Sequence, residues 1–590
     1  MERCATYALL FIIGIITATM IATSMFSRTQ YMVYRLDKVA GIIPCEEGEV
    51  FCNGTANSST FEGMDEAARE QWVQSKSAYV STAMSLVSGI VGLFTIIPLG
   101  FVSDKYGRKV GLFIAYLGFA IESAMIASVM LFHLPLWVLI VATLPSSILG
   151  NGICGILTQI FVCITDLTEQ KAEVLERRLS VAPVIEGELA PLHRRSRTSS
   201  ILERSEPKSL STVQSTMASE RLSYIAMFEG VIGMTMAIVT MTIGPAISKF
   251  GFKFPGWFML ALVIVNLVLT VLMPNTKALW DTPTKKNSII PKEIDVNSKK
   301  KLLSISSAGE NQDSQNPVVA LAEPKKKTNC CVALKHAFSF VTVPITIEII
   351  ANLLASMVAL TDIPVLNLYF IGEPFGMSIS QVGITLGIRT IGCSVVSGLF
   401  VVFNMFYLQP RLATPNIKHM KLKRAKNSSE STNDNIEDNV PGFTDAEIAA
   451  ERHSKMLEAR RIMLFGLGGL FFIMAVSKFL YGISSSFGKP TCLILLVSAI
   501  ILNSFQFFGP IIRALLSGLV SCEVQGRLYA LIGFGDSFGG FIGMTSLPAL
   551  FASTVFMNAG FAFYMAALVL VVAFILNGIN IYLLLYGKYK

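Results

Sequence analysis

Two charged residues lie within long apolar stretches of this chain. Glu229 lies in Ala226-Met-Phe-Glu-Gly-Val-Ile-Gly, and Arg513 follows a Gly509-Pro510 pair. A charged side chain at the centre of a bilayer costs about 2.5 to 3.5 kcal/mol on insertion scales, so it needs a partner or a function. A carboxyl group enters an apolar region most easily when it is protonated, whereas a permanent cation suits an anionic solute or a carboxylate partner. We therefore predict proton coupling at Glu229 and solute binding at Arg513.

Each of these two residues also has a purely structural interpretation. Glu229 can act as a neutral, hydrogen-bonded acid that only packs helices, and Arg513 can extend its guanidinium to the membrane interface. Asp362 is a second carboxyl group that could take part in proton coupling, and Asp166 lies at the end of an apolar run, where an acidic residue is often simply solvated. Further candidates for solute contact are polar or aromatic, although an aromatic side chain in a span is more often packing. They are Tyr224, Asn367 and Tyr369.

The composition places these residues in a membrane protein. Of the 590 residues, 52% are hydrophobic and only 15% are charged, which is too apolar for a soluble protein. The net charge of +8 comes from Lys and Arg that fall mostly in loops between apolar runs, the pattern of cytoplasmic loops. No basic patch with interleaved aromatics supports nucleic-acid binding.

Apolar runs of about twenty residues or more recur along the whole chain, and each is long enough to cross a bilayer as a helix. They cover 7–25, 78–101, 110–132, 136–164, 224–247, 257–273, 340–370, 382–408, 462–480, 491–520, 529–551 and 561–586. The run 7–25 lacks a clear cleavage site, so we interpret it as a span and not as a signal peptide. The fold class is therefore an all-α membrane protein with about twelve spans and both termini cytoplasmic. We expect two six-helix bundles, 1–273 and 339–590, joined by a cytoplasmic linker, 274–338.

The hydrophilic segments fit this topology. The segment 28–77 is predicted to be an extracellular loop that is glycosylated at Asn53 and Asn57, with a local disulfide between Cys45 and Cys52. The segments 167–220 and 409–460 are predicted cytoplasmic inserts. Arg194-Arg-Ser-Arg-Thr-Ser in the first insert resembles a target of basophilic kinases, and a plain solvated linker is the alternative.

A short basic stretch joins the second and third apolar runs. It reads Gly100-Phe-Val-Ser-Asp-Lys-Tyr-Gly-Arg-Lys109, and its cations place it on the cytoplasmic side. The spacing resembles the loop between helices two and three of the major facilitator superfamily of transporters. We expect Asp104 to cap the third helix and Arg108 to reach Asp104 and an approaching helix end. Five residues then form a conformational switch: Gly100, Asp104, Gly107, Arg108 and Lys109.

A closer resemblance, over nearly all of the membrane portion, is to the proton-coupled folate transporter family. It is carried by the Cys-bearing first outer loop, the stretch Gly100 to Lys109, and Asp166. It continues in Phe228-Glu-Gly-Val-Ile-Gly, Val365-Leu-Asn-Leu-Tyr with Glu373-Pro, Gly509-Pro-Ile-Ile-Arg-Ala-Leu-Leu-Ser-Gly-Leu-Val and Glu523-Val-Gln-Gly. The resemblance implies proton coupling at Glu229, substrate binding and coupling at Arg513, switching at Asp104 and Arg108, and structural support from Asp166.

The chain departs from that family at two places. The folate carriers have a histidine in the seventh span that helps protonation, and here the corresponding place is near Ala359, with Asp362 one turn later. The family also pairs an outer-loop cysteine with one after the seventh span, yet Glu373-Pro-Phe-Gly-Met has none. Proton coupling would therefore depend on carboxylates, and folate itself is less firmly implied than the fold.

The sequence as a whole predicts a secondary transporter that moves a small organic solute, an organic anion resembling folate or related to it, together with protons. Its membrane is the plasma membrane or an endolysosomal membrane. The alternatives are a proton-independent facilitator and a non-transporting receptor or scaffold. No motif places a nucleophile, a base and an oxyanion donor together, so we do not expect an enzyme. We also expect no cofactor and no metal site.

Overall fold

The structure is a computed structural model of the 590-residue chain. It describes residues 2–44, 61, 63–150, 152, 155–164, 210–274, 342–359, 362–403, 406, 445–488, 490–517, 519–520 and 525–586. The chain divides into two units, one made of Met1–Thr276 with Val343–Lys590 and the other of Lys277–Thr342. Except for Thr342, the second unit lies outside the described residues, so everything below concerns the first unit.

The first half of that unit consists of helices joined by short turns in its described residues. Its helices are α1 (Glu2–Val39), α3 (Glu66–Tyr106), α4 (Arg108–Phe132), α5 (Trp137–Ala142), α6 (Leu144–Gly150), α8 (Leu210–Phe250) and α9 (Lys253–Leu272). Residues 155–164 are helical as well and continue the path of α5 and α6. Asp65 starts α3, because its carboxylate accepts the backbone N–H of Ala68 at 3.0 Å. Gly107 alone separates α3 from α4, with a φ of 105° that only glycine adopts easily.

The second half is also mostly helical in its described residues, and one of its spans is interrupted between Asn503 and Phe508. Its helices are α13 (Val343–Ala359), α14 (Asp362–Ile371), α15 (Ile379–Phe403), α18 (Asp445–Ser484), α19 (Thr491–Asn503), α20 (Phe508–Ser517), α21 (Gln525–Thr554) and α22 (Phe561–Tyr586). The helix is interrupted a few residues before the Gly509-Pro510 pair. The chain leaves the helix at Ser504 and re-enters it at Phe508, so Pro510 lies in the first turn of α20, where its missing N–H is not needed.

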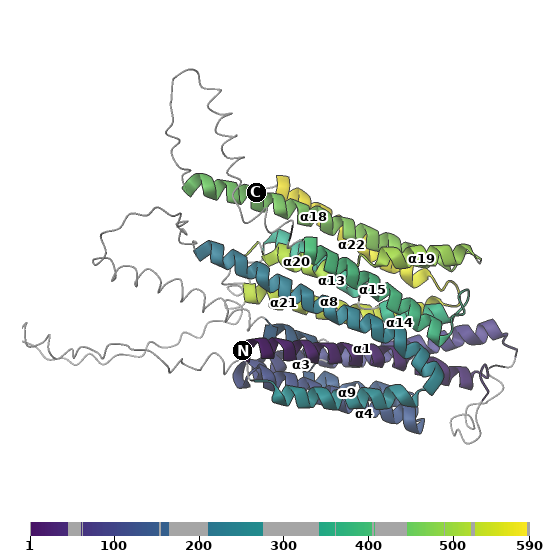
Figure 1. The fold of residues 1–590 in the computed structure, drawn as a ribbon. Helices are drawn as coiled ribbons and strands as arrows, with labels where there is room; N and C mark the ends of the chain where they lie inside the picture. The colour runs from purple at the N-terminus through teal and green to yellow at the C-terminus, as the bar shows by residue number, and fades with distance from the viewer. Residues whose placement is uncertain are drawn as a thin grey trace, which may run out of the picture. The chain divides into compact units, whose positions relative to one another are not determined.

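Eleven helical segments among the described residues are long and apolar enough to cross a membrane. They correspond to the predicted runs except 529–551, which lies in α21, a helix that carries Asp536 and several glycines. With α21 included, the chain has about twelve candidate membrane spans. This confirms the prediction of an all-helical membrane protein. Figure 1 shows these long helices running roughly parallel. We call the end where α1 begins and α22 ends the termini face, and the other end the opposite face.

Several helices are longer than the apolar runs predicted. α1 continues to Val39 instead of stopping at Met25, α8 begins at Leu210 and α18 begins at Asp445. The proposed loop 28–77 and the inserts 167–220 and 409–460 therefore each lose residues to helices. A prediction based on hydropathy misses these extensions because it assigns charged residues to loops. In α1, however, Arg35 and Lys38 are buried within the helix.

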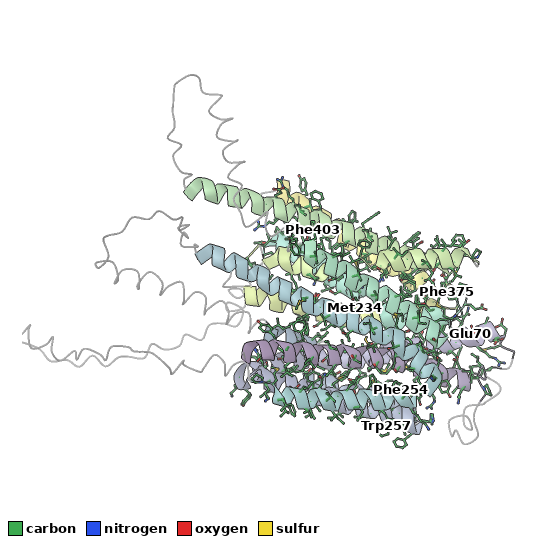
Figure 2. All side chains as sticks on the ribbon, viewed as in Figure 1. Glu70, Met234, Phe254, Trp257, Phe375 and Phe403 are labelled. Atoms are coloured by element: carbon green, nitrogen blue, oxygen red, sulfur yellow. The ribbon has the colours of Figure 1, made fainter. Side chains whose placement is uncertain are left out.

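Apolar side chains cover the outside of the bundle. Figure 2 shows Trp257 on α9 and Phe403 on α15 extending away from their helices. Trp257 is 59% exposed and Phe403 is 44% exposed, so neither packs in the protein core. An apolar exterior of this kind suits lipid as the surrounding solvent, as the sequence predicts.

The two halves meet mainly along two helix pairs, in which α8 packs on α15 and α3 packs on α21. Smaller contacts join α14 to α1 and α3, and α20 to α8. Near the opposite face, α8 and α15 approach so closely that a Cβ atom at Gly244 would lie 2.8 Å from the carbonyl oxygen of Ile379. A Cβ at Gly383 would lie 2.9 Å from the carbonyl of Thr240. Ser75 of α3 also donates to the carbonyl of Ala552 in α21 at 2.8 Å. The halves are thus packed together at this face.

This close packing predicts that Gly244→Ala favours a state in which the halves separate at the opposite face. A methyl group added against the backbone costs about 1–3 kcal/mol in the state with the halves packed together at this face. It therefore shifts the equilibrium by about 5- to 150-fold toward the state with the halves separated. The distance between spin labels on Ser248→Cys and Ser378→Cys, measured in a background without other reactive cysteines, should lengthen. Gly398→Ala is the matched control, since a Cβ there meets nothing within 4 Å. An unchanged distance distribution in Gly244→Ala would contradict this account.

Candidate functional site

Arg513 connects the two halves of the bundle. Its Nη1 donates to Oε1 of Glu229 on α8, in the first half. Its Nη2 donates to Oδ2 of Asp536 on α21, in the second half, at 3.3 Å. The planar guanidinium suits this role because it offers several donors in fixed directions. The two charged residues that the sequence singles out are therefore direct partners.

Asp536 is held by more than Arg513. Its Oδ1 accepts from Nδ2 of Asn352 at 2.7 Å and from Oγ of Ser356 at 2.8 Å. Asn352 and Ser356 lie four residues apart on α13, so both face the same side of that helix. Both Asp536 oxygens are thereby engaged, whereas Glu229 has Arg513 as its one hydrogen-bond partner among the described residues.

Aromatic rings line one side of the guanidinium. The Cζ atom of Arg513 lies 5.9 Å from the centroid of the Phe161 ring, within the range of a cation–π contact. Phe228, next to Glu229 in the sequence, packs edge-on against Phe161 and against Phe11, at centroid distances of 5.7 and 5.4 Å. Rings reduce the local dielectric and strengthen the electrostatic interactions beside them. We call Glu229, Arg513, Asp536, Asn352, Ser356 and Phe161 the central cluster.

The charged groups of the central cluster are not sealed from their surroundings. The side chains of Arg513, Glu229 and Asp536 are 23%, 25% and 28% exposed, respectively. A fully packed ion-pair network would instead show values near zero. All three charged groups are therefore partly accessible.

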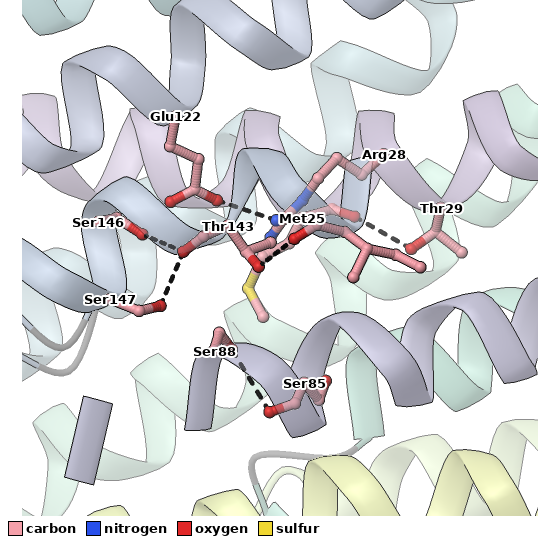
Figure 3. Close-up of polar contacts among 10 residues, drawn as sticks. Met25, Arg28, Thr29, Ser85, Ser88, Glu122, Thr143, Ser146 and Ser147 are labelled. Atoms are coloured by element: carbon pink, nitrogen blue, oxygen red, sulfur yellow. Dashed lines mark hydrogen bonds and ion pairs between the residues drawn. The ribbon is translucent and has the colours of Figure 1, made fainter. Parts of the chain in front are cut away.

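A second ion pair lies wholly within the first half. Figure 3 shows Arg28 of α1 extending toward Glu122 of α4, and Nη1 of Arg28 donates to Oε1 of Glu122 at 3.0 Å. Beside it, Ser146 and Ser147 both donate to the carbonyl of Thr143. The Glu122 side chain is only 6% exposed, so this pair is far more buried than the central cluster. Glu122 is thus neutralised within its own half.

The structure also places two of the predicted solute contacts. Tyr369 is buried in α14, and its hydroxyl lies 2.5 Å from the carbonyl of Tyr481 and 3.0 Å from Oγ of Ser484. Asn367 is also buried in α14, and neither of its side-chain amide atoms has a hydrogen-bond partner among the described residues. Neither residue contacts the central cluster through a hydrogen bond, and their role in solute binding stays a prediction.

The predicted switch residues lie at the termini face. Gly100 is in α3 and Gly107 is the link to α4. Nη1 of Arg108 donates to Oγ of Ser103 at 3.4 Å, and Nζ of Lys109 donates to the carbonyl of Val271 at the end of α9. Gly107 is the N-cap residue of α4. The side chain of Asp104 lies outside the described part of the structure, so the expected cap by Asp104 stays a prediction. Asp104 itself lies in α3, before the link.

Other predicted residues lie outside the described part of the structure. They are Asp166, Asn53, Asn57, Cys45 and Cys52, together with the side chains of Tyr224, Asp362 and Asp104. Among the residues that are described, no group of three or more His, Cys, Asp or Glu side chains is placed to hold a metal ion.

Sequence reasoning missed the roles of Asp536 and Arg28. Asp536 was one charge among several near spans, and nothing in its neighbourhood indicates Arg513 as a partner. Arg28 fell in the proposed outer loop. A signal for Arg28 was available, since no glycine or proline interrupts the chain between Met25 and Val39 and a continued helix was therefore possible.

Comparison with known proteins adds evidence at the level of the fold. No sequence profile of a known family matches the chain, and no curated protein matches it. The structure of the proton:xylose symporter XylE, a major facilitator superfamily protein, superposes with a TM-score of 0.50 at 11% identity, covering 97% of this chain and 95% of XylE. The nucleoside transporter NupG gives 0.49 at 13% identity, covering 99% and 100%. The human organic anion transporter MFSD10 gives 0.43 at 12% identity, covering 98% of each chain. With about twelve spans in two joined halves and this superposition on XylE, the chain has the major facilitator superfamily fold.

Proposed function

We propose that this protein is a secondary transporter of a small organic anion, which it moves together with protons by alternating access. The observation that carries the proposal is the contact of Arg513 with Glu229 of the first half and Asp536 of the second half. Alternating access requires the halves to separate around a site between them. Arg513 is shared between the two halves and partly exposed, so it is suited both to binding a solute between the halves and to holding them together when no solute is bound.

The difference between the two carboxylates supports coupling to protons. An anionic solute that binds the guanidinium competes with the carboxylates for it. Asp536 keeps its bonds to Asn352 and Ser356, whereas Glu229 loses the one partner it has here. A carboxylate left unpaired in an apolar setting is costly, and taking up a proton removes that cost. Solute binding at Arg513 would therefore promote protonation of Glu229.

The resemblance to known transporters is consistent with this mechanism, but the proposal rests on the contacts of Arg513. The motifs around Glu229 and Arg513 resemble those of the proton-coupled folate transporter family, which implies a folate-like solute. XylE, the fold neighbour with the TM-score of 0.50, is described as a proton:xylose symporter. The missing histidine near Ala359 assigns the coupling to carboxyl groups, in line with the arrangement at Glu229.

The direct test is transport by the purified full-length protein in proteoliposomes that contain an internal pH dye. Folates, peptidoglycan fragments and steroid conjugates would be offered at acidic and neutral external pH. We expect at least one organic anion to enter faster at acidic pH and to carry protons inward. Entry without proton movement would indicate a facilitator, and binding without entry would indicate a receptor or scaffold. Either result would overturn symport.

We also propose that the termini face is cytoplasmic, in a plasma or endolysosomal membrane, with the inserts open to kinases. The opposite face would then carry glycans on Asn53 and Asn57. Replacing both residues with glutamine should increase gel mobility by two glycan steps and abolish the shift that endoglycosidase causes in the wild type. An endoglycosidase shift that persists in the double variant would rule out these sites.

A further inference from the structure

A second carboxyl group in the second half is buried more deeply than any in the central cluster. Glu348 of α13 is 0% exposed. Its Oε1 accepts from Nδ2 of Asn577 at 3.0 Å and from Nδ2 of Asn580 at 2.8 Å, both on α22. Asn577 and Asn580 are three residues apart, so α22 presents both amides to the same place. Among the described ion pairs, none includes Glu348.

Three oxygen atoms in this group accept no hydrogen bond from any residue that the structure describes. They are Oε2 of Glu348, Oδ1 of Asn577 and Oδ1 of Asn580, and all three are buried. Glu122, the other deeply buried glutamate described here, has Arg28 beside it, and Asp536 has Arg513. An ionised carboxylate at Glu348 would thus be buried without a counter-charge, which costs several kcal/mol. The group has acceptors in excess and lacks a positive charge.

The neighbouring helices do not supply that charge. α13 packs against α20, α21 and α22. Among the side chains described on them, the charged ones are Arg513 on α20 and Asp536 on α21, which pair with each other. The segment Phe561–Tyr586 of α22 contains no Asp, Glu, Lys, Arg or His. Lys478 on α18, which packs against α22, is buried and donates to Oδ1 of Asn503 at 2.8 Å.

We infer that Glu348 is an exchangeable proton-binding residue, separate from Glu229. One proton on Oε2 converts the carboxylate to a neutral acid and supplies the donor that the surrounding oxygens lack. Oε1 remains free to accept from Asn577 and Asn580. Loss of the proton restores the carboxylate, so the site gains and loses one charge. Asn352, one turn further along α13, bonds to Asp536, so the site lies one helical turn from the central cluster. The inference goes beyond the proposed symport and does not depend on the solute.

Infrared difference spectroscopy on the full-length protein in lipid nanodiscs tests this inference with protons as the only ligand. Stepping the pH from acidic to alkaline should remove a carbonyl stretching band of a buried carboxylic acid, and the band should shift in D₂O. Glu348→Gln should lose this band completely. Glutamine has the shape of glutamic acid, still accepts from Asn577 and Asn580, and offers N–H donors to the unpartnered oxygens. A wild-type thermal unfolding temperature at acidic pH would show that this variant folds.

The control is Glu122→Gln, which should retain the band because it leaves Glu348, Asn577 and Asn580 unchanged. A spectrum of Glu348→Gln that matches the wild type at every pH would overturn the inference. So would a Glu348 band that persists at alkaline pH, which would indicate a permanently protonated structural acid. Repeating the titration with choline in place of Na⁺ separates a third case. If Na⁺ raises the unfolding temperature of the wild type but not of Glu348→Gln, the occupant is a sodium ion and the proton assignment is wrong.

Discussion

Replacing Arg513 with alanine is expected to abolish solute uptake and to destabilise the protein by about 3 kcal/mol, near the lower end of the range for breaking a buried ion pair. The variant leaves Glu229 and Asp536 without the cation they share. About a quarter of each side chain is exposed, so water offsets part of the cost. Uptake into proteoliposomes and the free energy of unfolding in denaturant would measure the two effects.

Two further variants refine this test. Arg513→Lys keeps the charge but not the planar fork, so it should recover part of the stability and little of the uptake. Arg461, exposed on α18, is the matched control, and Arg461→Ala should change neither quantity by more than about 0.5 kcal/mol or its equivalent in rate. If Arg513→Ala transports and unfolds like the wild type, the central cluster is not the solute site.

Glu229→Gln is expected to uncouple solute movement from the proton gradient. Glutamine can still accept from Arg513 but cannot take up and release a proton at physiological pH. Each pH unit of gradient supplies about 1.4 kcal/mol per coupled proton, enough for about tenfold accumulation. The wild type should concentrate its solute by that factor per unit, and Glu229→Gln should only equilibrate it. Accumulation at several imposed pH gradients is the measurement.

Controls separate coupling from folding in this second test. Solute exchange without a gradient should persist in Glu229→Gln, which shows that the variant is folded and binds its solute. Glu458, exposed on α18, is the matched carboxylate, and Glu458→Gln should retain acid stimulation. Unchanged acid stimulation in Glu229→Gln would remove this residue from the coupling mechanism and leave Glu348 and Asp362 as the carboxyl candidates.

The sequence is most informative where the free-energy cost of placing a residue in the membrane depends on the residue type alone. The helical membrane fold follows from the length of the apolar runs, since each must satisfy its backbone hydrogen bonds internally. Glu229 and Arg513 stand out because a charge in such a run is expensive wherever its partner lies. The same reasoning misses Arg28, because a charged residue beyond the end of an apolar run is indistinguishable from a loop residue.

Which residues form hydrogen bonds or ion pairs with one another, by contrast, is decided only by the tertiary structure. Glu229 and Arg513 are 284 residues apart, and their contact depends on how α8 packs beside α20 and α21. The pairing of Glu348 with Asn577 and Asn580 likewise depends on α13 lying against α22. The apolar helices of this chain resemble one another in composition, so the sequence does not show which faces meet. The sequence by itself determined that buried charges must be satisfied, and the packing of the helices decided which groups satisfy them, because hydrogen bonds and ion pairs form only at short range.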